Sequence, residues 1–181
     1  MKFLSPVLVL ACGSSGFLNA GPLEIVGYNT SQGLCTSAQI REQMLFGGIC
    51  FPPGMSWQDF TSRPIKWDGA GWSGGGPTPT ATNLAGYIDP DVTAVEVRFH
   101  RSGKVQAKTA TVAQIDGDLL AKLGVTEPFG RFAAILPGCI PPRAIRVVAR
   151  GASGEFLGAQ RGNSLLPHFC HLPPPPRSRE H

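Results

Sequence analysis

Alternating positions mark residues 92–109 as two paired β-strands. One face of the first strand carries Thr93, Val95, Val97 and Phe99, and the other carries Ala94, Glu96, Arg98 and His100. This period of two predicts a half-buried strand with one wet face. Ser102-Gly103 predicts a tight turn back. We expect the inward face to continue after it with Val105, Ala107 and Thr109, and Lys104, Gln106 and Lys108 to point outward.

Two further segments have the same strand character. Residues 129–136 are largely apolar and end at Pro137-Gly138, which predicts a strand stopped by a turn. Residues 144–150 and 155–160 flank a Gly-Ala-Ser-Gly sequence, which predicts a closing hairpin. Before all of these, Asp89-Pro90-Asp91 is a turn signature, because proline fixes φ and aspartate bonds its own backbone.

One helix interrupts the strands. Residues 116–124 begin with two candidate caps, Asp116 and Asp118, and end at Gly124. An apolar stripe comes from Leu119, Leu120 and Leu123. The helix is only about two turns long, so packing rather than propensity must hold it.

The N-terminal half has a different pattern. Residues 23–28 and 34–40 flank Gln32-Gly33, which predicts a β-hairpin. Residues 51–79 have no sustained period and predict a long irregular loop with a short strand near Ile65. Loops of this length are usually functional or disordered. The loop holds all three tryptophans, Trp57, Trp67 and Trp72.

Composition supports a loop-rich β protein. The 181 residues include 23 glycines and 17 prolines, and only 15% of the chain is charged, which disfavours long helices. The net charge of +4 is thinly spread along the sequence, with arginines interleaved among apolar residues at Arg143, Arg146, Arg150 and Arg161. Nucleic acid is not an expected partner, since phosphate binding favours a clustered basic face with stacking aromatics.

The N-terminus has the anatomy of an export signal. One lysine precedes a short apolar run that is far below the about 20 residues needed to span a membrane. Val9-Leu10-Ala11-Cys12 resembles a bacterial lipobox, which implies cleavage before Cys12 and lipidation of its thiol. Two alternatives stay open: an ordinary secretory signal cut nearer Ala20, and an incorrect start residue.

The other cysteines fit an oxidising compartment. Removing Cys12 leaves an even number, which suggests disulfides. Cys35 and Cys50 flank a short loop and are expected to pair. Cys139 and Cys170 are candidates for a second bridge, with buried free thiols as the alternative.

No motif predicts catalysis or a bound cofactor. Gly71-Trp72-Ser73-Gly74-Gly75 matches the G-x-S-x-G nucleophile elbow, but lacks the strand and helix that this elbow needs. His100 has no marked partner for general-base work. The His168-Phe169-Cys170-His171 cluster lacks zinc-site spacing, so no metal site is expected.

The order of strands resembles immunoglobulin-like sandwich domains of uncharacterised exported proteins from high-GC bacteria. The pieces that match are residues 92–99, the Ser-Gly turn, residues 132–137 and the closing hairpin. The resemblance implies a mainly β, antiparallel Ig-like β-sandwich with one short helix. The expected organisation is a signal or lipobox with tether (1–20), an N-terminal hairpin and Trp/Gly-rich loop packing on the main domain (21–80), the sandwich (81–162) and a disordered Pro-rich tail (163–181).

Function is expected to lie in binding. We expect a non-catalytic binding or structural module of the cell envelope, extracytoplasmic and either lipid-anchored or secreted. Its expected partner is an envelope protein or a cell-wall glycan, and it contacts the membrane through its lipid anchor only. Trp57, Trp67 and Trp72 are the candidate ligand-binding residues, since exposed aromatics stack on sugars. The alternative is a secreted hydrolase or glycan-binding protein that uses the Trp-rich loop near His100.

Overall fold

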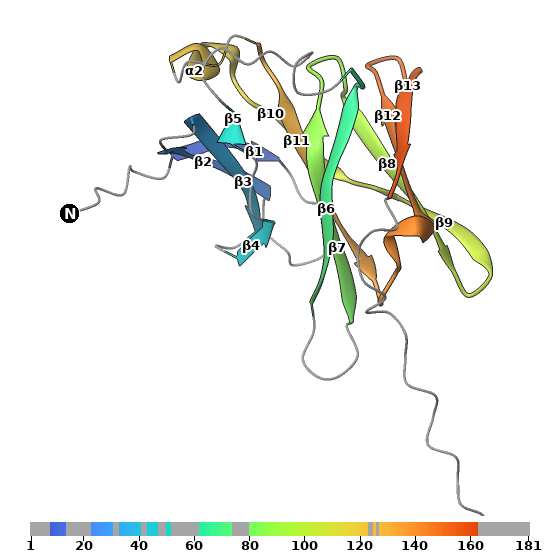
Figure 1. Cartoon of the computed structure of the whole chain (residues 1–181). Coiled ribbons are helices and arrows are strands. Elements are labelled where there is room, and N and C mark those ends of the chain that lie inside the picture. The colour runs from blue at the N-terminus through green and yellow to red at the C-terminus, as the bar shows by residue number, and fades with distance from the viewer. Residues whose placement is uncertain are drawn as a thin grey trace, which may run out of the picture.

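The computed structural model describes residues 8–13, 23–30, 33–40, 43–46, 50–51, 62–73, 80–122, 125 and 127–162 (Figure 1). This part is mainly antiparallel β. The strands are β1 (Leu8–Gly13), β2 (Leu23–Thr30), β3 (Gly33–Ile40), β4 (Gln43–Phe46), β5 (Cys50–Phe51), β6 (Ile65–Ser73), β7 (Ala81–Ile88), β8 (Ala94–Arg101), β9 (Lys104–Thr109), β10 (Thr111–Gln114), β11 (Gly130–Pro137), β12 (Ile145–Arg150) and β13 (Phe156–Arg161). The helices are α2 (Gly117–Lys122) and the 3-10 turn η1 (Pro142–Ala144).

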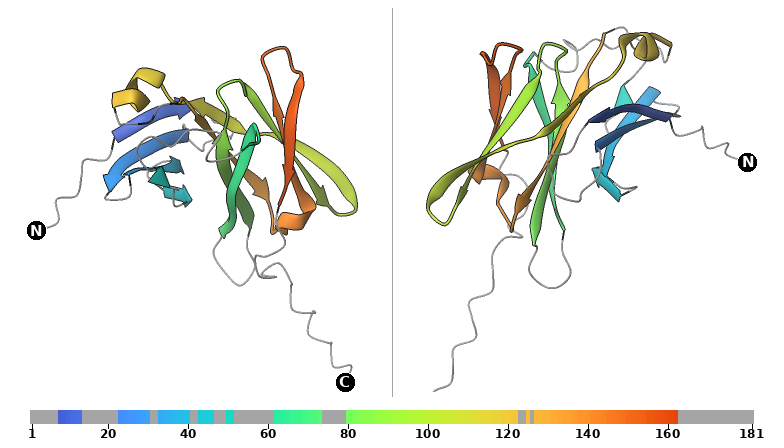
Figure 2. Two further views of the ribbon diagram at one scale, coloured as in Figure 1. Left: turned by 45° about the horizontal axis from the view of Figure 1, so that its top comes forward. Right: turned by 180° about the vertical axis from the view of Figure 1, so that it is seen from behind.

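The described strands form three sheets. The N-terminal sheet has the order β1-β2-β3-β4, with β5 also paired to β3. The β7 sheet has the order β10-β11-β7-β6, and the β8 sheet has the order β13-β12-β8-β9. Figure 2 shows the β7 and β8 sheets facing each other, with the N-terminal sheet beside the β7 sheet.

The β7 and β8 sheets share one hydrophobic core. The β7 sheet contributes residues such as Leu84, Phe132 and Leu136, and the β8 sheet contributes residues such as Val97 and Ile145. Burying one large apolar side chain contributes roughly 1.5–3 kcal/mol, so this shared core is the main force that holds the two sheets together. The arrangement is sandwich-like.

The N-terminal sheet covers the other face of the β7 sheet. Strand β1 contacts β10, and β4 contacts β6 and β7. Both faces of β7 and β11 are therefore buried. Consecutive residues of a strand point to opposite faces, and both members of the pairs Tyr87 and Ile88, and Arg131 and Phe132, are buried. The β8 sheet keeps a face that the other two sheets do not cover, with alternating buried and exposed residues along β8.

Strand β6 corrects the interpretation of residues 51–79 as irregular. Ile65–Ser73 pair with β7 along its whole length, with one register shift between Trp67 and Gly69. Ile65 is fully buried in the shared core. The shift explains why the sequence shows no clean period here, because an extra residue breaks the alternation of inward and outward side chains.

The prediction that Val105, Ala107 and Thr109 point inward from β9 is wrong. The two-residue turn has positive φ at Ser102 (51°) and Gly103 (73°), and it pairs Arg101 with Lys104 and His100 with Val105. Directly opposed residues share a face, so Val105 lies with exposed His100 and is itself 63% exposed. The length of the turn reverses the phase of the whole strand.

The helix α2 spans six residues, and Leu120 is its buried anchor. The amide of Leu120 donates to the carbonyl of Asp116 at 3.0 Å. Within the described ranges, no helix has both the length and the apolar character needed to cross a membrane.

Candidate functional site

Three arginines form a row across the uncovered face of the β8 sheet. Arg98 on β8 pairs in register with Arg146 on β12, and Arg146 pairs with Arg161 on β13. These strands lie side by side in Figure 1. All three side chains are exposed, whereas their neighbours Val97 and Val147 point into the core and are fully buried. The alternation of each strand therefore places its arginine on the same outer face.

A pocket of about 240 Å³ opens on this row. Its lining consists of Arg98, His100, Arg143, Ala144, Ile145, Arg146 and Arg161. Arg143 comes from η1, where Pro142 starts a tight turn and the amide of Ala144 donates to the carbonyl of Pro141 at 2.9 Å. This turn places a fourth arginine beside the row, just before β12 begins.

Negative charge reaches only one end of the row. Glu96 forms ion pairs with Arg98 and, at 3.5 Å, with Arg150. The hydrogen bond from Arg98 lowers the pKa of Glu96 below its usual value, and its neighbouring charges add to this effect. Among the described residues, no carboxylate forms an ion pair with Arg143, Arg146 or Arg161.

This excess of positive charge has a structural cost. Like charges directly opposite one another on adjacent strands destabilise a sheet. An oxyanion bound between the guanidinium groups would remove the repulsion, because arginine binds carboxylate and phosphate through two parallel hydrogen bonds. The row is therefore suited to anion binding. Among the described residues that line the pocket, none carries the carboxylate or hydroxyl that would make His100 part of a catalytic group.

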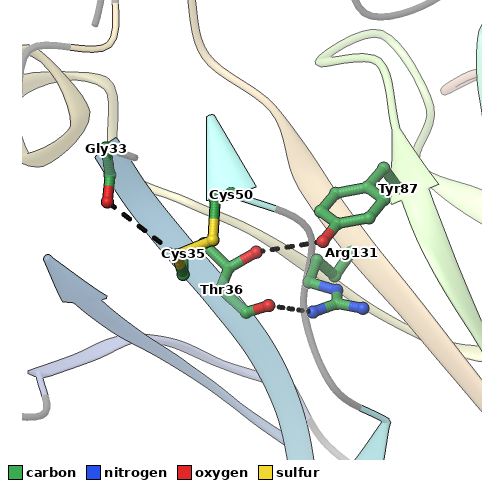
Figure 3. The surroundings of a disulfide bond; sticks show 6 residues. All are labelled: Gly33, Cys35, Thr36, Cys50, Tyr87 and Arg131. Carbon is green, nitrogen blue, oxygen red and sulfur yellow. Dashed lines mark hydrogen bonds between the residues drawn. A yellow bond between two sulfur atoms is a disulfide. The ribbon is translucent and has the colours of Figure 1, made fainter. Parts of the chain in front are cut away.

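A second polar cluster is buried between the N-terminal sheet and the β7 sheet (Figure 3). The guanidinium of Arg131, fully buried, pairs with Asp68 at 2.9 Å and donates to the Thr36 carbonyl at 3.0 Å. It also lies over the Tyr87 ring, 4.4 Å from the centroid. Burial raises the pKa of Asp68, and the attraction of Arg131 opposes that shift. Since this cluster is enclosed by protein, we assign it a structural role.

The disulfide between Cys35 and Cys50 lies next to this cluster (Figure 3). The sequence predicted this disulfide. The two residues are directly paired across β3 and β5. Cys139 is also disulfide-bonded, and its expected partner Cys170 lies outside the described residues. Cys12 falls in β1, opposite Glu24.

The structure describes only some of the tryptophans, and the histidine cluster lies wholly outside the described residues. Trp67 is half-buried and packs against the shared core, and its indole N–H donates to the Gly69 carbonyl. Trp57 and the side chain of Trp72 lie outside the described residues, as do His168 and His171. Within the described ranges, no three His, Cys, Asp or Glu side chains gather as a metal site would require.

The arginine row is the feature that the sequence interpretation missed. The sequence predicts thinly spread charge at Arg143, Arg146 and Arg161, but these residues meet at one pocket. The sequence held one signal for this row, because the alternation of inward and outward side chains places Arg98 and Arg146 on the outer faces of their strands.

No family model, curated protein or solved structure matches the chain.

Proposed function

We propose that this protein is an exported binding module that takes its ligand through oxyanions at the arginine pocket of the β8 sheet. The observation that carries the proposal is the in-register row of Arg98, Arg146 and Arg161, in which only Arg98 has a carboxylate partner within the described structure. Repulsion along this row is relieved by a bound anion.

Export is supported by the disulfide and by the N-terminal pattern. The Cys35–Cys50 bond suits an oxidising compartment. The lipobox-like sequence ending at Cys12 would add a lipid anchor, and cleavage there would remove most of β1. In the mature protein β2 would then become the edge of the N-terminal sheet. A signal cut nearer Ala20 would secrete the protein without an anchor.

The fold supports binding through a surface. Two facing antiparallel sheets with a common core are compatible with an immunoglobulin-like sandwich, which we propose as the finer fold class. Such domains generally work through faces and loops. An envelope protein or a cell-wall glycan remains the proposed partner, now with the requirement that it carries acidic groups.

The competing hydrolase hypothesis has weaker support. His100 does lie in a pocket, but the charged side chains that line it are four arginines. Arginines can stabilise an oxyanion but do not accept the proton that a hydrolytic water must lose. Binding therefore fits the composition of this pocket better than catalysis.

Titration calorimetry with galacturonate and with inorganic phosphate at low ionic strength tests the anion site. We expect heat of binding in the wild type and its loss in the Arg146→Gln/Arg161→Gln double variant. Lys104→Gln removes one exposed positive charge outside the pocket and should leave binding unchanged. Equal binding by all three proteins would contradict the assignment of the site.

A further inference from the structure

We propose that the arginine row binds a linear acidic polysaccharide that lies across the strands of the β8 sheet, with carboxylates on successive sugars. This inference rests on the proposed function, and it adds the shape and chemical class of the ligand. It depends on the geometry of the row and on the side chains that surround it.

The row provides repeated positive charge along one direction. Adjacent strands lie about 4.8 Å apart, so arginines directly opposite one another on three strands form a line roughly 10 Å long. Arg98, Arg146 and Arg161 occupy this line from β8 to β13. A line of donors matches a ligand with several anionic groups better than a single small anion.

A second set of hydrogen-bonding side chains lies beside the line. His100 is two residues beyond Arg98 on β8, which is about 7 Å along the strand. Arg143 on η1 lies toward the same end of the strands as His100, and both residues line the same pocket as Arg146. The site is thus wider than one row of oxyanions, and it offers donors to hydroxyl groups as well as to carboxylates.

The volume of the pocket supports an extended ligand. A water molecule occupies about 30 Å³ in the liquid, so a pocket of about 240 Å³ is much larger than one oxyanion. The guanidinium group of arginine binds a planar carboxylate through two parallel hydrogen bonds. The described lining has no Phe, Tyr or Trp, so this pocket would hold its ligand through charge and hydrogen bonds and not through stacking on an aromatic ring.

Glu96 limits the affinity for anions at the β8 end of the row. Its carboxylate already pairs with Arg98 and competes there with a ligand carboxylate. Arg146 and Arg161 are therefore the strongest positions for the polysaccharide. Removing the competing charge in Glu96→Gln should increase affinity for the same ligand, a gain that loss of folding cannot produce.

Calorimetry with galacturonate monomer, dimer and tetramer tests the inference at low ionic strength. We expect the tetramer to bind at least about tenfold more tightly than the monomer, since linked groups bind a second site at high effective concentration. Arg146→Gln and Arg161→Gln should each weaken tetramer binding about fivefold, because each removes a charge-assisted pair. Lys104→Gln should change it less than about twofold, as expected for an exposed charge outside the site.

Several outcomes would overturn the inference. Equal affinity for monomer and tetramer would exclude an extended ligand but leave the anion pocket in place. Tighter binding of a short polyphosphate or of single-stranded DNA with the same charge would exclude a carboxylate polysaccharide. Absence of binding by every anion would refute the proposed function itself. All three arginines are exposed, so each variant should fold, with a thermal midpoint at or above that of the wild type because charge repulsion along the row is reduced. Arg161→Glu provides a charge-reversed second variant.

Discussion

The guanidinium of Arg131 donates a hydrogen bond of 3.0 Å to the main-chain carbonyl of Thr36, 95 residues earlier in the chain. This bond joins β11 of the β7 sheet to β3 of the N-terminal sheet. The Thr36 hydroxyl donates in turn to the Tyr87 hydroxyl at 3.3 Å. Four polar groups from four strands, with Asp68 as the fourth, therefore hold the N-terminal sheet against the β7 sheet.

Replacing Arg131 by methionine should destabilise the protein by about 3–5 kcal/mol, because it leaves the Asp68 carboxylate buried without its partner. Urea unfolding followed by circular dichroism measures the loss. The double variant Arg131→Met/Asp68→Asn removes both charges and should recover part of it. A loss below about 1 kcal/mol in the single variant would contradict the structural role of this pair.

Removing the disulfide should also lower stability. The bond closes a loop with a sequence separation of 15, which corresponds to about 3 kcal/mol in the chain-entropy model. We expect the Cys35→Ser/Cys50→Ser variant to unfold at lower urea concentration than the wild type under oxidising conditions. After reduction the two proteins should converge. A wild type that already matches the variant before reduction would show that the bond contributes nothing.

Gly86→Ala should disrupt the packing of β7. A Cβ at this position would overlap the Lys66 carbonyl on β6 and the ring of Phe132 on β11. Because backbone and a core ring cannot easily move, we expect a loss of about 1–3 kcal/mol. Gly69→Ala on β6 is the matched control, since a Cβ there has no atom within 4 Å. Comparable melting temperatures for the two variants would contradict the close approach at Gly86.

Glu96 should contribute to the acid sensitivity of the protein. Its pKa in the folded protein is lowered below the ordinary glutamate value of 4.5, chiefly by the hydrogen bond from Arg98. The ionised form is therefore favoured by folding, so its contribution is present above pH 4.5 and is lost as the pH falls through the folded pKa. Urea midpoints between about pH 6 and about pH 3 should fall less in Glu96→Gln than in the wild type. An identical slope would refute this coupling.

The sequence could predict which residues of β8 point inward, because the period of two is set within the strand itself. Val95, Val97 and Phe99 are buried, as expected, and Arg98 and His100 are exposed. The same reasoning failed for β9. There the phase depends on how many residues the turn contains, and a two-residue turn places Val105 opposite His100.

The sequence could not identify β6 as an edge strand of the β7 sheet. The register shift between Trp67 and Gly69 removes the alternation that would reveal a strand. Nor could it show why β7 and β11 are buried on both faces. That pattern follows from a third sheet packed on the outside, which is a long-range contact rather than a local preference.

By itself, the sequence determined the strand-rich character of the chain, the inward phase of β8 and the pairing of Cys35 with Cys50. Only the tertiary structure decided that Arg98, Arg146 and Arg161 lie in one row. The alternation within each strand already points each arginine outward. Whether the three arginines lie opposite one another depends on the registers of β8 with β12 and of β12 with β13. Those registers are set by which residues bury in the shared core, because a slip of one residue would turn every buried side chain outward.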